Sequence, residues 1–309
     1  MGFAGMHATA SAEPEGQIAP RRAPRRPVRF RPAGVPYLLS LPAVLLTAML
    51  LLSIWNLVSM SLGTDGPSGS FTLDYYAKAI LDPYYRNIFW VSLSLAAWTT
   101  VVCALLGYPV AYYMHCASPV VRRLVLIILV VVSFSDYVLR MYGLILVIGR
   151  NGLLNQLLVA SGLIGAPVKM MYSQLGVVIG MVMGNIVFMI LAIGGSLERL
   201  DGSLSHAAAL LGANRVQTFL RITLPLSMPG VLAGAAIVFL LAMASYMTPA
   251  MLGAGFVKMI GNLIYEQGVA MFDMPFASAI AMIVLAFSIL LIALLNLVLD
   301  RYGRRFGTR

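Results

Sequence analysis

The sequence is poor in charged residues. Only 10% of its 309 residues are Asp, Glu, Lys or Arg, whereas 60% are hydrophobic. A soluble globular domain carries about 25% charged residues, so this chain lacks the groups that would cover a water-exposed surface. Together with a mean hydropathy of +0.90, the composition excludes a soluble enzyme, a nucleic-acid-binding module and a disordered scaffold. It predicts an integral membrane protein.

Cysteine and histidine are also scarce, with two and three copies. If Cys103 and Cys116 lie on one helix, they are about 20 Å apart along its axis, well beyond the roughly 7 Å that a disulfide allows. The histidines His7, His115 and His206 fall in different segments. We therefore expect no disulfide between the cysteines and no histidine-based metal site.

Familiar catalytic motifs are absent as well. The chain has no Gly-Lys dipeptide and hence no phosphate-binding loop for ATP, and it has neither HExxH nor GxSxG. We expect no catalytic residues, no metal and no cofactor. Three classes of membrane protein stay open: a transporter subunit, a self-contained carrier or channel, and a structural subunit.

Six long apolar stretches are present instead. Each is long enough to cross about 30 Å of hydrocarbon as a helix, and a helix satisfies its own backbone hydrogen bonds in lipid. The stretches are Tyr37–Leu62, Asn87–Met114, Leu124–Gly149, Met170–Leu197 (with the span beginning near Gln174), Pro229–Gly253 and Met274–Leu299. The sequence therefore predicts an all-α membrane protein with six transmembrane helices.

Basic residues are divided unevenly between the two sides of this arrangement. With the N-terminus inside, the cytoplasmic tails and loops hold 15 Lys and Arg residues and the opposite side holds 5. The positive-inside rule then places both termini in the cytoplasm, and it accounts for the net charge of +10 without nucleic acid. We expect a disordered basic tail over residues 1–36, a transmembrane domain over 37–300 and a second basic tail over 301–309.

The connection over residues 198–228 differs from the others because it has a helical pattern of its own. Asp201 and Ser203 suit a helix N-cap, and Gly212 stands where a left-handed residue would end that helix. Asn214 can begin a second helix, which Pro225 would stop. This pattern fits equally well a helix-turn-helix that docks against a partner and an amphipathic pair lying on the bilayer.

The sequence of this loop, HAAALLGANRVQTFLRITLPLSMPG, resembles the EAA loop of ABC importer permeases. That pattern is Glu-Ala-Ala, three residues, Gly, nine residues and Ile-x-Leu-Pro. The matching positions are Ala207, Ala208, Gly212, Ile222, Leu224 and Pro225, while His206 stands where the family usually has Glu. The resemblance implies that the loop seats the permease on its ATPase subunit, with a changed contact at position 206.

Further stretches, among them LLGYPVAYYM, LRMYGLILVIGRNGLLN and MPFASAIAM, are similar to the spermidine/putrescine-type permeases. The resemblance covers roughly residues 37–300 and implies the ABC importer permease fold. It implies a lipid-embedded subunit of the bacterial inner membrane that pairs with a second permease, two ATPase subunits and an extracytoplasmic solute-binding protein. The chain would then be no enzyme itself, because a separate subunit hydrolyses ATP.

The function implied is the pore of an ATP-driven importer for polyamines or a related small polar solute. One alternative is a permease of the same kind for another solute, such as an amino-acid-like, sulfonate or phosphonate compound. The other is an autonomous secondary carrier. Such carriers often contain an internal repeat, and the sequence shows none.

Two groups of residues are candidates for the translocation path. Asp136 and Arg140 fall within a predicted span, where ionisable residues usually face a bundle interior or cavity. Their i, i+4 spacing predicts one helix face and a possible pair, so they line the path or form a neutralised structural pair. Tyr246, Thr248 and Pro249 form the second group, because Pro249 interrupts helical hydrogen bonding. It marks either a kink near a gate or the end of the fifth span.

Small residues recur in two spans. Gly176, Gly180 and Gly184 are spaced every four residues in the fourth span, as are Gly230 and Gly234 in the fifth. This spacing lets helix backbones approach closely, so we interpret these glycines as packing positions rather than binding positions.

Overall fold

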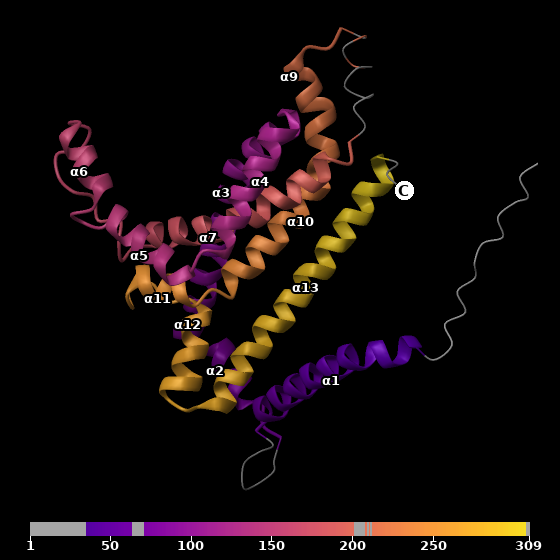
Figure 1. Ribbon diagram of the computed structural model, residues 1–309. Helices are drawn as coiled ribbons and strands as arrows, with labels where there is room; N and C mark the ends of the chain where they lie inside the picture. The colour runs from indigo at the N-terminus through magenta and orange to yellow at the C-terminus, as the bar shows by residue number, and fades with distance from the viewer. Residues whose placement is uncertain (1–34, 64–70, 201–207, 209, 211, 307–309) are drawn as a thin grey trace, which may run out of the picture. The chain divides into compact units, whose positions relative to one another are not determined.

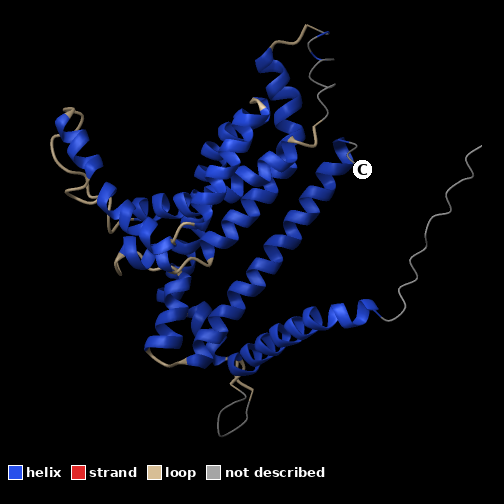
Figure 2. Ribbon diagram, in the orientation of Figure 1, coloured by secondary structure: helices blue, strands red, loops and turns tan. Residues whose placement is uncertain are grey.

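The computed structural model describes residues 35–63, 71–200, 208, 210 and 212–306. Throughout these ranges the regular structure is helical, with no strand (Figure 2). Six segments are long and apolar enough to cross a membrane: Ser40–Ser61, Pro83–Cys116, Tyr137–Ala160, Gln174–Leu197, Arg215–Met243 and Met274–Leu299. The predicted all-α class and the number of spans are therefore confirmed, whereas the third and fifth spans have other bounds than expected.

Contacts between residues divide the chain into two units, 1–50 and 51–309. The first contains the beginning of helix α1 (Val35–Ser61), which continues through Pro42 without a break. Its side chains over residues 40–50 are all exposed, as expected of an apolar helix that faces lipid or another chain.

In the second unit, α3 (Pro83–Cys116), α7 (Gln174–Leu197) and α10 (Leu224–Met243) pack against one another and form the centre of the fold (Figure 1). The helix α13 (Met274–Phe306) packs against α10, and the short helix α2 (Asp74–Leu81) packs against α13. Glycines allow the close approach of α7 and α10. A Cβ added to Gly230 would collide with Ser196 and would lie 2.8 Å from the carbonyl oxygen of Ala192. This supports the packing interpretation.

The third predicted span is divided. In place of one helix over Leu124–Gly149, the chain forms α4 (Pro119–Phe134), α5 (Tyr137–Ile148) and α6 (Leu153–Ala160). The Asp136 carboxylate accepts a hydrogen bond from the backbone N–H of Leu139 at 2.8 Å. Asp136 is therefore the N-cap of α5. This helix begins near the middle of the span that the apolar run predicts.

The fifth span begins earlier than predicted. The helix α9 (Arg215–Thr218), a π-helical turn η1 (Phe219–Thr223) and α10 follow one another without interruption. The N–H of Leu224 bonds to the carbonyl of Phe219, five residues back, and Pro225, which has no N–H, comes next. The wider turn accommodates the backbone N–H that Pro225 lacks, so the helix continues. The prediction that Pro225 stops a helix is therefore wrong.

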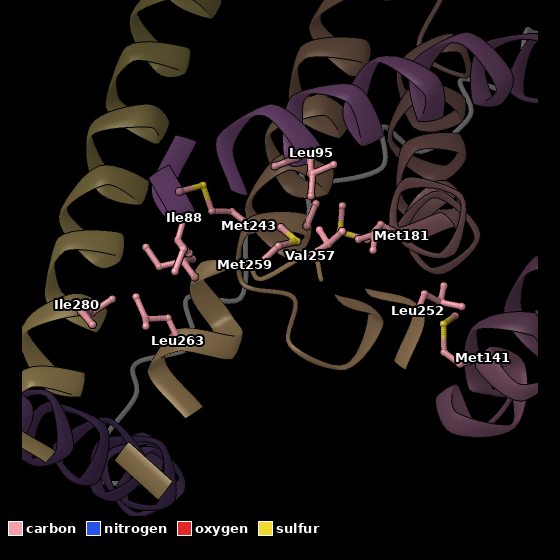
Figure 3. Close-up of a cluster of buried hydrophobic side chains, with 14 of the residues drawn as sticks. Ile88, Leu95, Met141, Met181, Met243, Leu252, Val257, Met259, Leu263 and Ile280 are labelled. Atoms are coloured by element: carbon pink, nitrogen blue, oxygen red, sulfur yellow. The ribbon is translucent and has the colours of Figure 1, made fainter. Parts of the chain in front are cut away.

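Beyond α10 the chain forms α11 (Met247–Gly253), α12 (Ile260–Tyr265) and a second π-helical turn, η2 (Glu266–Ala270). Residues of these short elements, together with α3, α5, α7, α10 and α13, form one of two hydrophobic clusters, in which Leu252 lies against Met141 and Met243 against Met259 (Figure 3). The second cluster fills the space between α3, α7 and α10 nearer the start of α10, and it contains Cys103. Both cysteines are free, as their spacing predicts.

Candidate functional site

Two regions at opposite ends of α10 carry the residues of interest. We name the first the loop end, which comprises residues 198–230 with the parts of α3, α4 and α7 that touch them. We name the second the break end, which comprises residues 244–273 with the parts of α3, α5 and α7 that touch them. In the described residues no group of three or more His, Cys, Asp or Glu side chains is placed to hold a metal ion.

At the loop end the start of α9 is tightly specified. The Asn214 carboxamide oxygen accepts from the Gln217 backbone N–H at 2.8 Å, and the Gln217 side chain accepts from the Asn214 N–H at 3.1 Å. This reciprocal capping box satisfies two donors that the first helical turn leaves free. The prediction that a helix begins at Asn214 is confirmed.

Just before this helix, Gly212 has φ +82, in the left-handed region that the turn was predicted to need. A Cβ at this position would meet nothing within 4 Å. The requirement for glycine therefore comes from the backbone and not from a lack of space.

The other predicted loop residues are placed as follows. Ala208 is buried, and Ile222, Leu224 and Pro225 are half-buried on the continuous helix. His206 and Ala207 lie outside the described residues. The residues that the structure does describe therefore present a partly covered helix start rather than a separate second helix.

Aromatic contacts hold this helix against α3, and the sequence analysis missed them. The ring of Phe219 meets the rings of Tyr108 and Tyr112 edge to face, with centroids 5.7 and 5.0 Å apart. The Tyr108 hydroxyl is hydrogen-bonded to the Ser227 hydroxyl at 2.8 Å. The i, i+4 spacing of the two tyrosines was a signal for such a contact, because it puts both rings on one helix face.

The loop end also contains an ion pair between α4 and the end of α7. Arg122 near the start of α4 pairs with Glu198, the residue that follows α7. The two side chains are 39% and 49% exposed, so the pair contributes little to stability. It joins the start of α4 to the end of α7.

At the break end, α10 stops at Met243 and α11 starts at Met247. Pro249 lies in the first turn of α11, where backbone N–H groups have no partner within the helix. The fifth span has therefore already ended before Pro249, which agrees with a helix end in this region and not with a kink inside the span, while a role of Pro249 at a gate stays a prediction. Thr248 is fully buried, and its hydroxyl is hydrogen-bonded to the hydroxyl of Tyr137, which joins α11 to α5.

Asp136 and Arg140 do not pair. The Asp136 carboxylate is turned to the backbone of its own helix as an N-cap. The Arg140 guanidinium lies over the ring of Tyr137, 5.5 Å from its centroid, and donates to the Ser135 carbonyl at 3.4 Å. The expectation of a pair is wrong because Asp136 precedes the first turn instead of lying within the helix.

The sequence analysis also missed an ion pair between Lys258 and Glu266. The Lys258 ammonium lies 2.8 Å from Oε2 and 3.1 Å from Oε1 of Glu266, and 3.5 Å from the Tyr84 hydroxyl. The hydrogen-bonded carboxylate raises the pKa of Lys258, opposed in part by desolvation. The stabilisation is thus fully present below the usual lysine pKa of about 10.4 and is lost only as the pH rises through the raised pKa.

Two tyrosines stack on each other, and one of them, Tyr265, directly precedes Glu266 in the sequence. The rings of Tyr246 and Tyr265 have centroids 4.5 Å apart and planes inclined by 30°. The Asn262 side-chain amide donates to the Tyr246 carbonyl at 3.2 Å, which holds the residue before α11 against α12. Tyr246, predicted as a path residue, is therefore tied to the segment that carries Glu266.

Among the cavities at this end of the fold, two share Phe256 in their lining. The first has a volume of about 370 Å³ and is lined by Tyr84, Asn87, Ile88, Val91, Gln174, Gly255, Phe256, Val257 and Lys258. The second, of about 580 Å³, is lined by Arg150, Pro167, Lys169, Met170, Met171, Tyr172 and Phe256. The first thus offers neutral amide and hydroxyl groups beside one lysine, and the second offers two basic side chains.

Residues 34–308 match the family described as "Binding-protein-dependent transport system inner membrane component". The chain is 36% identical over 210 residues to the spermidine/putrescine transport system permease protein PotB of Haemophilus influenzae, covering 68% of this chain and 73% of that protein. It is 38% identical over 209 residues to PotB of Escherichia coli, covering 68% and 76%. The sulfate transport system permease protein CysT of Salmonella typhimurium is 31% identical over 147 residues, covering 45% and 50%.

Solved structures share the fold. A bacterial alginate ABC transporter in complex with an alginate-bound periplasmic protein matches with a TM-score of 0.71 and 16% identity, covering 88% of this chain and 94% of that one. The MetNI methionine ABC transporter matches with a TM-score of 0.52 and 14% identity, covering 69% and 93%.

Proposed function

Since the chain belongs to the family of binding-protein-dependent transport system inner membrane components, we propose that it forms one half of the pore of an ABC importer for polyamines such as spermidine and putrescine. The observation that carries the choice of solute is the identity of 36% and 38% to two polyamine permeases over 68% of the chain. We infer a second permease, two ATPase subunits and an extracytoplasmic binding protein as its partners.

The loop end supports the contact with the ATPase subunit. A capping box, a left-handed glycine and an aromatic contact to α3 all specify the path of one short segment. A segment held in this way can pass a displacement from a bound ATPase to α10, because α9, η1 and α10 form one continuous helix. A loop that merely lay on the bilayer would have no need of this continuity.

The break end supports the entry of a cation. With the loop end in the cytoplasm, as the excess of basic residues indicates, the break end faces the outside. Three carboxylates of this region, Asp82, Glu266 and Asp273, lie close enough to act electrostatically on Tyr85. Carboxylates grouped in this way can accept charge-assisted hydrogen bonds from the ammonium groups of a polycation.

The test is uptake by the assembled importer. The chain, purified with its native partner subunits and reconstituted into liposomes with ATP inside, should take up radiolabelled spermidine or putrescine when its binding protein is added outside. Omission of ATP or of the binding protein is the control and should abolish uptake. ATP-dependent uptake of neither polyamine would contradict the proposed solute.

An inorganic anion is a second candidate solute. The identity of 31% to a sulfate permease favours it, as does the cavity lined by Arg150 and Lys169, since paired cations bind oxyanions. The same liposomes should therefore be tested with radiolabelled sulfate. Uptake of sulfate without uptake of polyamines would replace the first proposal by the second.

A further inference from the structure

The Lys258–Glu266 ion pair has features of an exchangeable contact. Glu266 is the first residue of the π-helical turn η2, and such turns occur frequently at functional sites. The Lys258 ammonium contacts both carboxylate oxygens, yet the two side chains are still 34% and 32% exposed. Water and a dissolved cation can therefore reach a carboxylate that already holds a cation.

We propose that Glu266 receives an ammonium group of the cationic solute, and that Lys258 is a tethered cation that occupies this carboxylate until the solute displaces it. The inference rests on the proposed function, because only a cationic solute can exchange with Lys258. A lysine side chain ends in the same primary ammonium group as a polyamine, so the two compete for one set of acceptor atoms.

Aromatic surface adjoins the carboxylate. The Tyr84 hydroxyl lies 3.5 Å from the Lys258 ammonium, and 51% of Tyr84 is exposed. The face of a tyrosine ring attracts ammonium groups. A flexible solute with several ammonium groups thus finds an anion and an open aromatic ring at the same ion pair, which suits a polyamine better than a single ammonium ion.

A cavity with polar lining residues lies beside Lys258 and can receive its side chain. The cavity of about 370 Å³ beside it is lined by Tyr84, Asn87 and Gln174 among others. The side-chain amides of Asn87 and Gln174 form no hydrogen bond with any residue that the structure describes. Their oxygens can accept hydrogen bonds from an ammonium group. A Lys258 side chain that leaves Glu266 can therefore form new hydrogen bonds in this cavity.

The exchange predicts opposite effects for the two partners of the pair. Removing Glu266 removes the acceptor of the solute, whereas removing Lys258 removes its competitor. A purely structural ion pair predicts the reverse pattern, in which either single change leaves one charge unpaired and both changes act in the same direction. The sign of the effect of a change at Lys258 therefore separates the two roles.

The experiment measures equilibrium binding of radiolabelled spermidine to the complex of both permeases and the ATPase subunits in lipid nanodiscs. The binding protein is omitted so that the affinity belongs to the membrane complex. Glu266→Gln should raise the Kd about tenfold, the loss of one charge-assisted contact, while Lys258→Met should lower it severalfold. The double variant should bind as weakly as Glu266→Gln. Asp74→Asn, which removes an exposed carboxylate at the start of α2, should leave the Kd unchanged.

Every outcome bears on the inference. Effects of the same sign at Lys258 and Glu266, or loss of the folded complex in both single variants, would show that the pair is structural and would overturn it. If the unaltered importer neither binds nor takes up polyamines, the proposed function fails and the inference fails with it. If the unaltered importer takes up spermidine while Lys258→Met does not tighten binding, the inference alone fails.

Discussion

The loop end and the break end lie at the two ends of the same helix, and they are built in opposite ways. At the loop end three helical elements run on as one from Arg215 to Met243, and α7 and α10 touch through backbone at Gly230. At the break end α10 stops, and three short elements are joined by hydroxyl, amide and ion-pair contacts. The first construction suits the proposed transmission of a displacement, because the helix is continuous, whereas the second contains polar contacts that can exchange one at a time.

The largest effect expected from this difference concerns glycine. Gly230→Ala should destabilise the folded protein by about 1–3 kcal/mol, because the new methyl group meets the Ala192 carbonyl on a rigid helix. Gly180→Ala, at the break end, should cost less. There the methyl group meets the far end of the Leu252 side chain, which can shift, and the methyl group of Thr248 on the short helix α11, whereas at Gly230 it meets the backbone of a long helix.

Thermal unfolding of the purified assembly measures both changes. Gly194→Ala serves as the control on α7, since a Cβ there has no neighbour within 4 Å, and it should be neutral or slightly stabilising. Equal losses for Gly230→Ala and Gly180→Ala would refute the contrast between a rigid and a yielding end.

A smaller effect is expected at Gly212. Gly212→Val forces a β-branched residue to φ +82, which costs about 1–2 kcal/mol and should shift the turn before α9. We expect reduced co-purification of the ATPase subunit and a severalfold loss of uptake. Gly212→Asn should retain more of both, because asparagine tolerates the left-handed region. Unchanged values for the valine variant at normal expression would argue against a coupling role for the turn.

The smallest effect is a coupling energy close to zero. Because Asp136 and Arg140 do not touch, the stability losses of Asp136→Asn and Arg140→Gln should add to within about 0.5 kcal/mol in a double-mutant cycle. Asparagine is itself a good N-cap, so the first change should be mild. The same cycle on Lys258 and Glu266, which do touch, provides the matched comparison. A coupling well above 0.5 kcal/mol for the first pair would show that the two side chains meet after all.

Several features of both ends were predictable because they depend on neighbours in the chain. The capping box at Asn214 and the left-handed conformation of Gly212 arise from residues within four positions of each other. The close approach of α7 and α10 was visible in the spacing of the glycines. The division of the third span was harder to predict, because a single polar residue in a long apolar run fits both a helix interior and a helix start.

The polar contacts of the break end could not be predicted from the sequence. Tyr137 and Thr248 are separated by 111 positions, and Lys258 and Tyr84 by 174. Such pairs depend on how the helices pack, and no local pattern encodes that. Lys258 and Glu266 are only eight positions apart, but the path between them passes through a loop and a helix, so their spacing does not predict contact.

By itself the sequence determined the class of molecule and its number of spans, because crossing about 30 Å of hydrocarbon requires a minimum length of apolar helix that can be counted. It also determined the resemblance of residues 207–225 to a known loop. Only the tertiary structure decided that Pro225 lies in a continuous helix and that Pro249 lies in the first turn of a new one. At Pro225 a π-turn compensates for the missing N–H, whereas in the first turn of α11 that N–H would have had no partner within the helix, and which of the two occurs depends on how the surrounding helices pack.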